Sequence, residues 1–263
     1  MSNATATNCV FIGNSAGGGT PGNAFGSGGA AHYGTLYNCT LIANSAGVEG
    51  GGAVDVTAYN CTIVSNFVTG TPFLGQQRIP TGGAAYCNLT NCIVMFNRSV
   101  FFPKLANYET NCALGFSCAS PLPPGIGNIE ADPLFTSPSQ GDFRLSLGSP
   151  CIDTGTNLTS LPATDLGGLP RLLDGNADVV AQVDMGAYEF NPYRFIGTQS
   201  TLLGLSCTLL GEPDRQARIE SSPDFLNWTS VETLRLPLSG QTQIQVPSGD
   251  ARFGFIRAVR VEL

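Results

Sequence analysis

Residues 60–66 read Asn-Cys-Thr-Ile-Val-Ser-Asn, one copy of a pattern in which Asn-Cys precedes apolar residues and a second asparagine. Further copies occupy 8–14, 38–44 and 91–97, and a degenerate copy begins at Asn111. The copies begin 30, 22, 31 and 20 residues apart, and Gly-Gly-Ala precedes three of them, at 28–30, 51–53 and 82–84. This period, with its glycines and alternating apolar positions, predicts a parallel β-helix whose equivalent strands stack about 4.8 Å apart.

Alternation along each strand assigns its side chains to two faces. It predicts that the repeat cysteines and the apolar residues two positions later point inward, and that the closing asparagines form a column at a turn. The outward positions are unusually apolar; we expect the C-terminal domain or a long loop to cover them, with an interaction surface as the alternative. The inward residues are Cys9, Cys39, Cys61, Cys92, Phe11, Leu41, Ile63 and Val94, the column is Asn14, Asn44, Asn66 and Asn97, and the outward residues include Val10, Ile12, Ile42, Val64, Ile93 and Met95.

Composition restricts the ligands. The chain has 263 residues and a net charge of −7, which disfavours nucleic acid because phosphate binding needs clustered Lys and Arg. A polyanionic glycan would also be repelled unless calcium bridged it, whereas a neutral polymer would not. No apolar run is long enough to insert into a membrane, and no signal peptide is visible. Because the sequence opens inside a repeat, we expect a module of a longer exported protein, with an extracellular or cell-surface location.

The nine cysteines predict buried thiols rather than a disulfide framework. Stacked equivalent cysteines project in parallel, which holds their Cβ atoms farther apart than the roughly 3.8 Å of a disulfide. With His32 the only histidine, a zinc site has little support. Cys112 with Cys118 is the best candidate for a bridge.

Four ordered motifs follow the repeats: DPLF at 132–135, GDFRL at 141–145, GSPCIDTG at 148–155 and VDMGAYEF at 183–190. Together with the repeats they resemble the choice-of-anchor Q β-helix proteins and their closing module, here about 118–190. The resemblance implies secreted bacterial surface proteins with no single known activity. The stretch 165–171 reads DLGGLPR, less acidic than is usual in that family, which weakens a metal role there.

After Asn191 the composition changes, and alternating runs at 201–210, 215–221, 228–236, 241–247 and 253–261 predict a small antiparallel β-sandwich. The predicted fold is therefore all-β, a right-handed, pectate-lyase-like parallel β-helix over 1–190 and a small C-terminal sandwich over 191–263. The stretch 219–228 resembles accessory domains of secreted bacterial proteins. We expect its Trp228 to pack in the core rather than to bind a sugar.

The predicted binding site lies on the helix and on two long insertions. His32, Asp55 and Tyr86 each follow the first glycine of a Gly-Gly-Ala by four residues, so they are expected to form one outward column offering hydrogen bonds and an aromatic ring. An ordinary solvated row of side chains is the alternative. The insertions at 67–81 and 98–110 add further candidates, which are Phe73, Gln76, Gln77, Arg78, Phe102 and Tyr108.

Calcium is the only cofactor for which a motif exists. Asp174, Asn176 and Asp178 copy the start of a calcium loop, but Val179 and Met185 stand where its glycine and glutamate belong. Asx-rich turns explain the same residues.

The predicted function is a non-catalytic carbohydrate-binding module. The repeats carry few ionisable groups, and Glu49 with Asp55 is a poor match to the paired carboxylates of a glycosidase. At the level of fold, the chain resembles β-helix carbohydrate-binding modules attached to bacterial enzymes that degrade plant polysaccharides. That resemblance implies a neutral, xylan-like ligand and a catalytic domain in the parent chain. The alternatives are a polysaccharide lyase or hydrolase acting on the same face, and an adhesin or stalk fragment.

Overall fold

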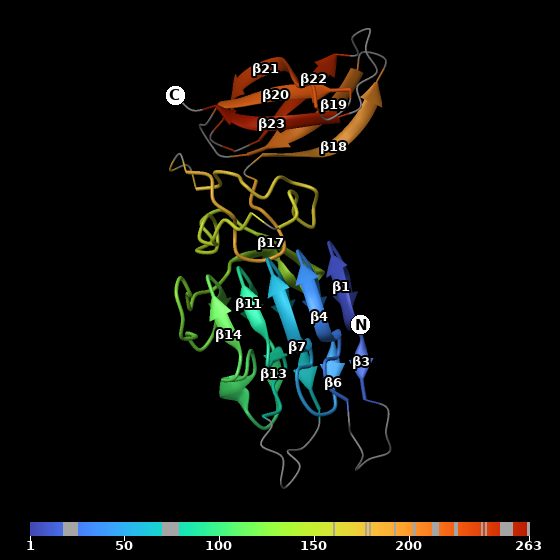
Figure 1. The fold of residues 1–263 in the computed structure, drawn as a ribbon. Helices are drawn as coiled ribbons and strands as arrows, with labels where there is room; N and C mark the ends of the chain where they lie inside the picture. The colour runs from blue at the N-terminus through green and yellow to red at the C-terminus, as the bar shows by residue number, and fades with distance from the viewer. Residues whose placement is uncertain are drawn as a thin grey trace. The chain divides into compact units, whose positions relative to one another are not determined.

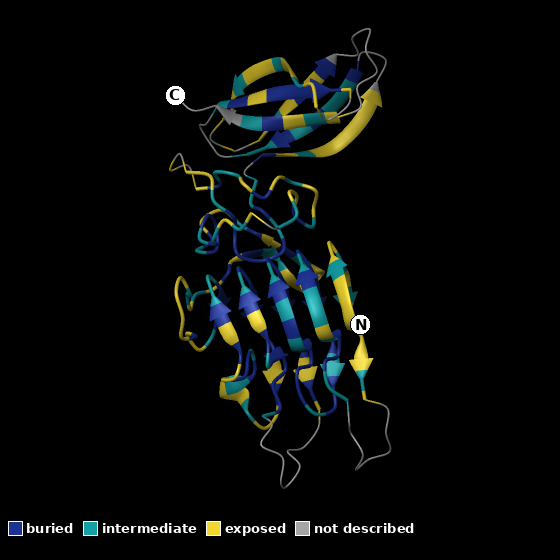
Figure 2. Cartoon of the chain, in the orientation of Figure 1, coloured by how far each residue is buried: buried dark blue, intermediate teal, exposed yellow. Residues whose placement is uncertain are grey.

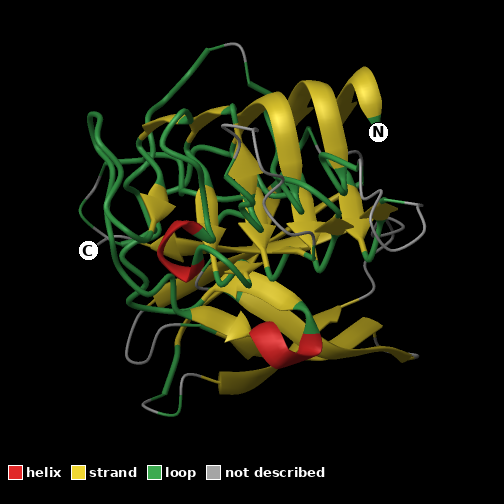
Figure 3. Ribbon diagram, turned by 90° about the horizontal axis from the view of Figure 1, so that it is seen from below, coloured by secondary structure: helices red, strands yellow, loops and turns green. Residues whose placement is uncertain are grey.

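The computed structural model describes residues 1–17, 26–69, 79–159, 161–176, 178, 180–191, 193–201, 204–211, 216–223, 226–237, 239, 241–247 and 255–261. The chain divides into two compact units, Met1–Phe190 and Asn191–Leu263. In the described residues the regular structure is mainly β-strand, and the first unit also contains two short 3-10 helices, η1 (Pro103–Leu105) and η2 (Pro138–Gln140) (Figure 3). No helix of the described residues is long and apolar enough to cross a bilayer.

The first unit is a parallel β-helix, as the repeat predicts (Figure 1). The strands of successive coils stack into three parallel sheets, here named A, B and C. Sheet A contains β1 (Ser2–Thr7), β4 (Ala31–Tyr37), β7 (Ala53–Tyr59), β11 (Asn88–Thr90) and β14 (Ala113–Gly115), with β10 (Ala84–Ala85) also paired to β7. Sheet B contains β2 (Val10–Ile12), β5 (Thr40–Ile42), β8 (Thr62–Val64), β12 (Ile93–Met95) and β15 (Cys118–Ala119). Sheet C contains β3 (Ser15–Ala16), β6 (Ser45–Ala46), β9 (Phe67–Val68) and β13 (Arg98–Ser99).

The repeat residues stack in register. Thr40 pairs with Thr62, which pairs with Ile93, so the preceding cysteines Cys39, Cys61 and Cys92 lie in one row. All three are fully buried, and the Cys39 backbone N–H donates to the Cys61 Sγ at 3.4 Å. Alternation therefore placed the cysteines correctly.

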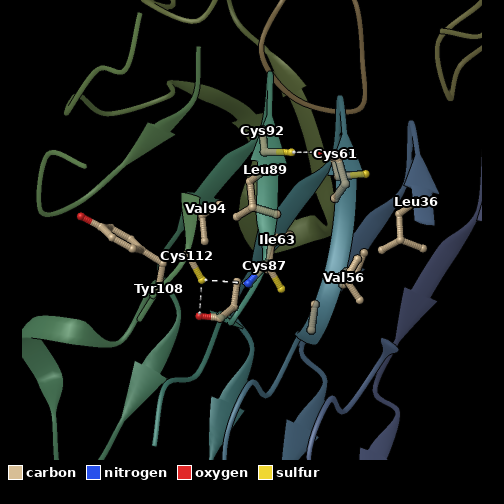
Figure 4. Close-up of a cluster of buried hydrophobic side chains, with 14 of the residues drawn as sticks. Leu36, Val56, Cys61, Ile63, Cys87, Leu89, Cys92, Val94, Tyr108 and Cys112 are labelled. Carbon is tan, nitrogen blue, oxygen red and sulfur yellow. Dashed lines mark hydrogen bonds between the residues drawn. The ribbon is translucent and has the colours of Figure 1, made fainter. Parts of the chain in front are cut away.

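The core of the β-helix consists of small and medium apolar side chains (Figure 4). All nine cysteines are free thiols and eight of them are buried, as predicted, and the candidate bridge between Cys112 and Cys118 does not form. Cys112 instead stacks on Cys87, whose backbone N–H donates to the Cys112 Sγ at 3.3 Å. Cys112 directly precedes β14 of sheet A, whereas Cys118 begins β15 of sheet B, so the two cysteines belong to different sheets.

The outward apolar face of sheet B is covered by the closing module, which follows β15. Val64, Ile93 and Met95 share a buried cluster with residues of that module, including Phe135 of β16 (Phe135–Ser137) and Phe143 of β17 (Asp142–Leu145). Of the two covers that the sequence suggested, the C-terminal domain or a long loop, the structure shows a long segment between the repeats and that domain covering these coils. In β2, an edge strand of sheet B, Val10 and Ile12 are exposed.

The C-terminal unit is built from two antiparallel sheets. One contains β18 (Arg194–Thr201), β19 (Gly204–Leu210) and β22 (Gln241–Pro247), and the other β20 (Gln216–Ser222), β21 (Thr229–Arg235) and β23 (Phe255–Val261). Residues of both sheets, among them Leu209 and Ile219, share one buried cluster. The sequence runs predicted five of these strands and missed β18.

Candidate functional site

The outer surface of sheet A carries a continuous set of polar and aromatic side chains. Leu36, Ala58 and Leu89 of successive strands are buried in the core, so alternation turns their neighbours outward. Figure 2 shows this mixture of buried and partly exposed positions along β4 and β7. Strand pairing arranges the outward residues in two rows, Thr35–Thr57–Asn88 and Tyr37–Tyr59–Thr90. We name these six residues the sheet A face.

Two tyrosines dominate the sheet A face. The rings of Tyr37 and Tyr59 stack with centroids 5.3 Å apart and planes 11° from parallel. Both residues are half-buried, and their neighbours Asn88 and Thr90 supply an amide and a hydroxyl. Our sequence reasoning missed this pair, although each tyrosine directly precedes a repeat Asn-Cys. That recurrence, at positions 37 and 59, was the available signal.

The predicted column of His32, Asp55 and Tyr86 is wrong by one residue in its first member. His32 pairs with Val54, so Tyr33 is the neighbour of Asp55. The positive φ angles of 58° at Tyr33, 52° at Asp55 and 54° at Tyr86 mark the equivalent positions. The error arose because Gly28 aligns with Gly50, the first of a run of three glycines, whose φ is likewise positive.

His32 still lies beside the corrected column. Its ring stacks on Tyr33 with centroids 4.3 Å apart, and its Nε2 lies 3.9 Å from the Asp55 Oδ2. About a third of each side chain is exposed, which makes any ion pair weak. The column of Tyr33, Asp55 and Tyr86 continues the aromatic and polar character of sheet A towards the start of its strands.

Of the six loop residues predicted for the binding site, the structure describes only Phe102 and Tyr108. Tyr108 is buried, packs in the β-helix core and donates its hydroxyl to the Pro121 carbonyl at 3.0 Å, so its expected exposure is wrong. The reason is that Tyr108 bridges to Ala84 as part of the next coil. Phe102 is half-buried directly before η1. Phe73, Gln76, Gln77 and Arg78 lie outside the described residues.

Two glutamates of the β-helix are buried. Glu49 and Glu109 have no exposed surface, and Glu49 accepts a hydrogen bond from the Ser27 hydroxyl at 3.3 Å. Burial, and then the nearby charge of Glu49, raise the pKa of Glu109. Carboxylates withdrawn from the surface are poorly placed to act on an extended polymer.

The acidic residues of the closing module form a buried polar network. The Asp184 carboxylate accepts hydrogen bonds from the backbone N–H groups of Asp153 and Phe190, and the Asp165 carboxylate accepts from Leu169 and Glu189. Arg171 lies 3.2 Å from the Glu189 Oε1 and donates to two backbone carbonyls. These groups hold irregular backbone in place, which is a structural role for the DLGGLPR and VDMGAYEF motifs.

Burial dominates the ionisation of this network. It raises the pKa of Asp184 to about 7 and that of Asp153 to about 6, while the backbone hydrogen bonds oppose the shift. The charge of Arg171 acts on Asp165, Asp184 and Glu189. One arginine cannot balance three ionised carboxyl groups, so full ionisation would leave uncompensated buried charge.

The calcium candidates form Asx-type turns. The Asn176 side-chain oxygen accepts from the Asp178 N–H at 2.9 Å, and Asp178 accepts from Val180 at 2.9 Å. Asp174 has other interactions in the structure. Among the described residues, no group of three His, Cys, Asp or Glu side chains could hold a metal ion.

The C-terminal unit has its own surface cluster. The Arg257 guanidinium lies 4.0 Å from the centre of the Trp228 ring, and Glu220 accepts hydrogen bonds from Arg218 and Arg257, both at 2.7 Å. Trp228 is half-buried and outside the core cluster, so the expected core position is wrong. A cation above its face replaces apolar packing.

Comparison with known proteins adds no family: no protein-family model matches the chain, and no curated protein matches it either. The fold and the side chains of the sheet A face therefore carry the functional argument.

Proposed function

We propose that this chain is a non-catalytic module that binds a neutral polysaccharide through the sheet A face. The observation that carries the proposal is the stacked pair of Tyr37 and Tyr59, bordered by Thr35, Thr57 and Asn88 on a rigid sheet. Aromatic rings pack against the C–H groups of sugars, and hydroxyl and amide groups bond sugar hydroxyls. The net charge of −7 favours an uncharged ligand over a polyanion.

The wider setting follows from resemblance. The motifs shared with choice-of-anchor Q proteins support a secreted or cell-surface location in a bacterium. The likeness to β-helix carbohydrate-binding modules supports a plant cell-wall ligand of the xylan type and a catalytic domain in the parent chain. An adhesin or stalk would present the same solenoid without a glycan site.

Affinity electrophoresis and calorimetry against xylan, glucan and mannan test the proposal. We expect one of these polymers to bind, and the double variant Tyr37→Ala/Tyr59→Ala to weaken binding at least tenfold, about 1.4 kcal/mol. Phe101→Ala is the control, since Phe101 is an exposed aromatic residue after β13 and outside sheet A. Loss of binding in the control but not in the double variant would contradict the proposal and would place the site in the loops.

Catalysis is tested on the same preparation. Prolonged incubation with each polymer, followed by assays for reducing ends and unsaturated products, is expected to show no product. Product formation that Asp55→Ala abolishes would establish the lyase or hydrolase alternative instead.

A further inference from the structure

The stacking geometry decides which ring faces of the tyrosine pair are free. Parallel rings whose centroids are only 5.3 Å apart cannot lie side by side in one plane, because their edges would collide. Tyr37 and Tyr59 are therefore stacked, so their ring normals have a component along the row that links successive coils. Each ring covers part of the face that the other turns towards it. The remaining faces look along the row, from Tyr37 towards Thr7 and from Tyr59 towards Thr90.

On the Tyr59 side the side chains of the row become smaller from one strand to the next, which leaves a step in the surface beside the Tyr59 ring. Thr90 follows Tyr59, and Gly115, which has no side chain, follows Thr90. Two strand spacings, about 9.6 Å, therefore separate the Tyr59 strand from bare backbone. Beside this step, Asn88 is exposed and Ala113 carries only a methyl group. A six-membered sugar ring fits such a space when it stands against the Tyr59 ring.

The closing module fixes the strand that carries Thr90. The Asn91 side chain donates to the Thr156 carbonyl at 2.9 Å and accepts from the Thr156 N–H at 2.8 Å. Asn91 directly follows Thr90, so this pair of bonds fixes the backbone beneath the step. A preorganised surface loses less entropy when a ligand binds.

We propose that the principal sugar subsite is the step formed by Tyr59, Thr90 and Gly115, and that the bound glycan runs parallel to the strands rather than along the row of coils. This inference rests on the proposed function. A ring stacked on Tyr59 leaves its linkages in its own plane, and the tyrosine pair blocks continuation along the row. The ligand class is an unbranched glycan of sugars with equatorial hydroxyls, such as β-1,4-linked glucose or xylose, because both faces of such rings carry only C–H groups.

The variant Thr90→Tyr separates this geometry from a flat aromatic platform. It would extend the tyrosine row and fill the step, so we expect affinity for the bound polymer to fall at least tenfold, measured by calorimetry. A flat platform would instead grow larger and bind as well or better, and that result would overturn the inference. Threonine and tyrosine both favour strands, so the fold is expected to tolerate the change.

Thr7→Tyr is the matched control, since it fills the opposite end of the row beside Tyr37 and should leave affinity unchanged. If Thr90→Tyr does not fold, Thr90→Arg occupies the same step with a flexible side chain and should weaken binding similarly. Wild-type protein that binds no polymer at all would sink the proposed function itself, whereas wild-type binding that neither Thr90 variant weakens would reject only this subsite.

Discussion

Asparagine side chains carry the corners of the β-helix. In one column, the side-chain oxygens of Asn44, Asn66 and Asn97 each accept from the backbone N–H of the equivalent residue one coil earlier, all at 2.9 Å. In a second column, Asn38, Asn60 and Asn91 have φ angles of 49°, 50° and 54°. Asparagine tolerates this left-handed region better than most residues. At one corner the repeated asparagine therefore accepts hydrogen bonds from backbone N–H groups. At the other corner it adopts the left-handed backbone conformation that the turn needs.

Replacing Asn66 by alanine should destabilise the β-helix unit by about 2–4 kcal/mol. The Asn66 side chain accepts from the Asn44 N–H and donates to the Leu41 carbonyl, each at 2.9 Å, and all these groups lie in or near the core. Leaving buried donors and acceptors unpaired costs about 1–3 kcal/mol for each group. Urea unfolding measures the change. The exposed Asn88→Ala should shift stability by less than about 0.5 kcal/mol, and equal effects of the two variants would contradict the column's role.

Close stacking of strands explains the glycines that precede sheet A. A Cβ placed on Gly83 would lie 2.0 Å from the Asn107 carbonyl oxygen and 2.8 Å from the Asn97 side-chain nitrogen. Neither neighbour can move without breaking the asparagine column. At the equivalent position one coil earlier, a Cβ on Gly52 would lie 2.8 Å from the Gly83 carbonyl oxygen and 3.1 Å from the Asn66 side-chain nitrogen. An element this tightly packed has its register set by backbone contact as well as by side chains.

Gly83→Ala should therefore lower the free energy of unfolding by about 1–3 kcal/mol through overpacking. Gly115→Ala is the matched variant, because its new Cβ would meet only the Ile126 carbonyl oxygen, at 3.9 Å. We expect Gly115→Ala to be neutral or slightly stabilising. Thermal unfolding of both variants checks the contrast, and a neutral Gly83→Ala would show that the corner can relax.

At the scale of the molecule, the two units should respond oppositely to pH. In the first unit, burial raises the pKa of Asp184 to about 7, so the folded state binds protons that the unfolded chain releases above about pH 4. This contribution to stability should be fully present below about pH 4 and be lost as the pH rises through about 7. In the second unit, desolvation of Glu220 is outweighed by Arg257 and Arg218, and its pKa is lowered. That contribution is present at neutral pH and lost on acidification.

Hydrogen exchange measured by mass spectrometry follows both units in one sample. Between pH 4.5 and 8, after correction for intrinsic exchange rates, we expect the opening free energy of the closing module to fall by a few kcal/mol. The variant Asp153→Asn should reduce this slope, because Asp153 has a pKa near 6 and an amide oxygen can still accept from Gly175. A closing module equally protected at both pH values would refute the assignment of raised pKa values.

Sequence alone determined the solenoid. A repeat of Asn-Cys segments buries its cysteines and pairs its strands when successive coils stack on one another. It also identified the inward faces and the need for a cover over sheet B, since alternation is local. Sequence could not place Tyr33 beside Asp55 or Tyr108 in the core. The first outcome depends on which glycine of one coil meets which of the next, and the second on the bridge between Tyr108 and Ala84, so contacts between coils decide both. The tyrosine stack and the buried acids of the closing module are likewise tertiary, because residues far apart along the chain create them only when the coils close together.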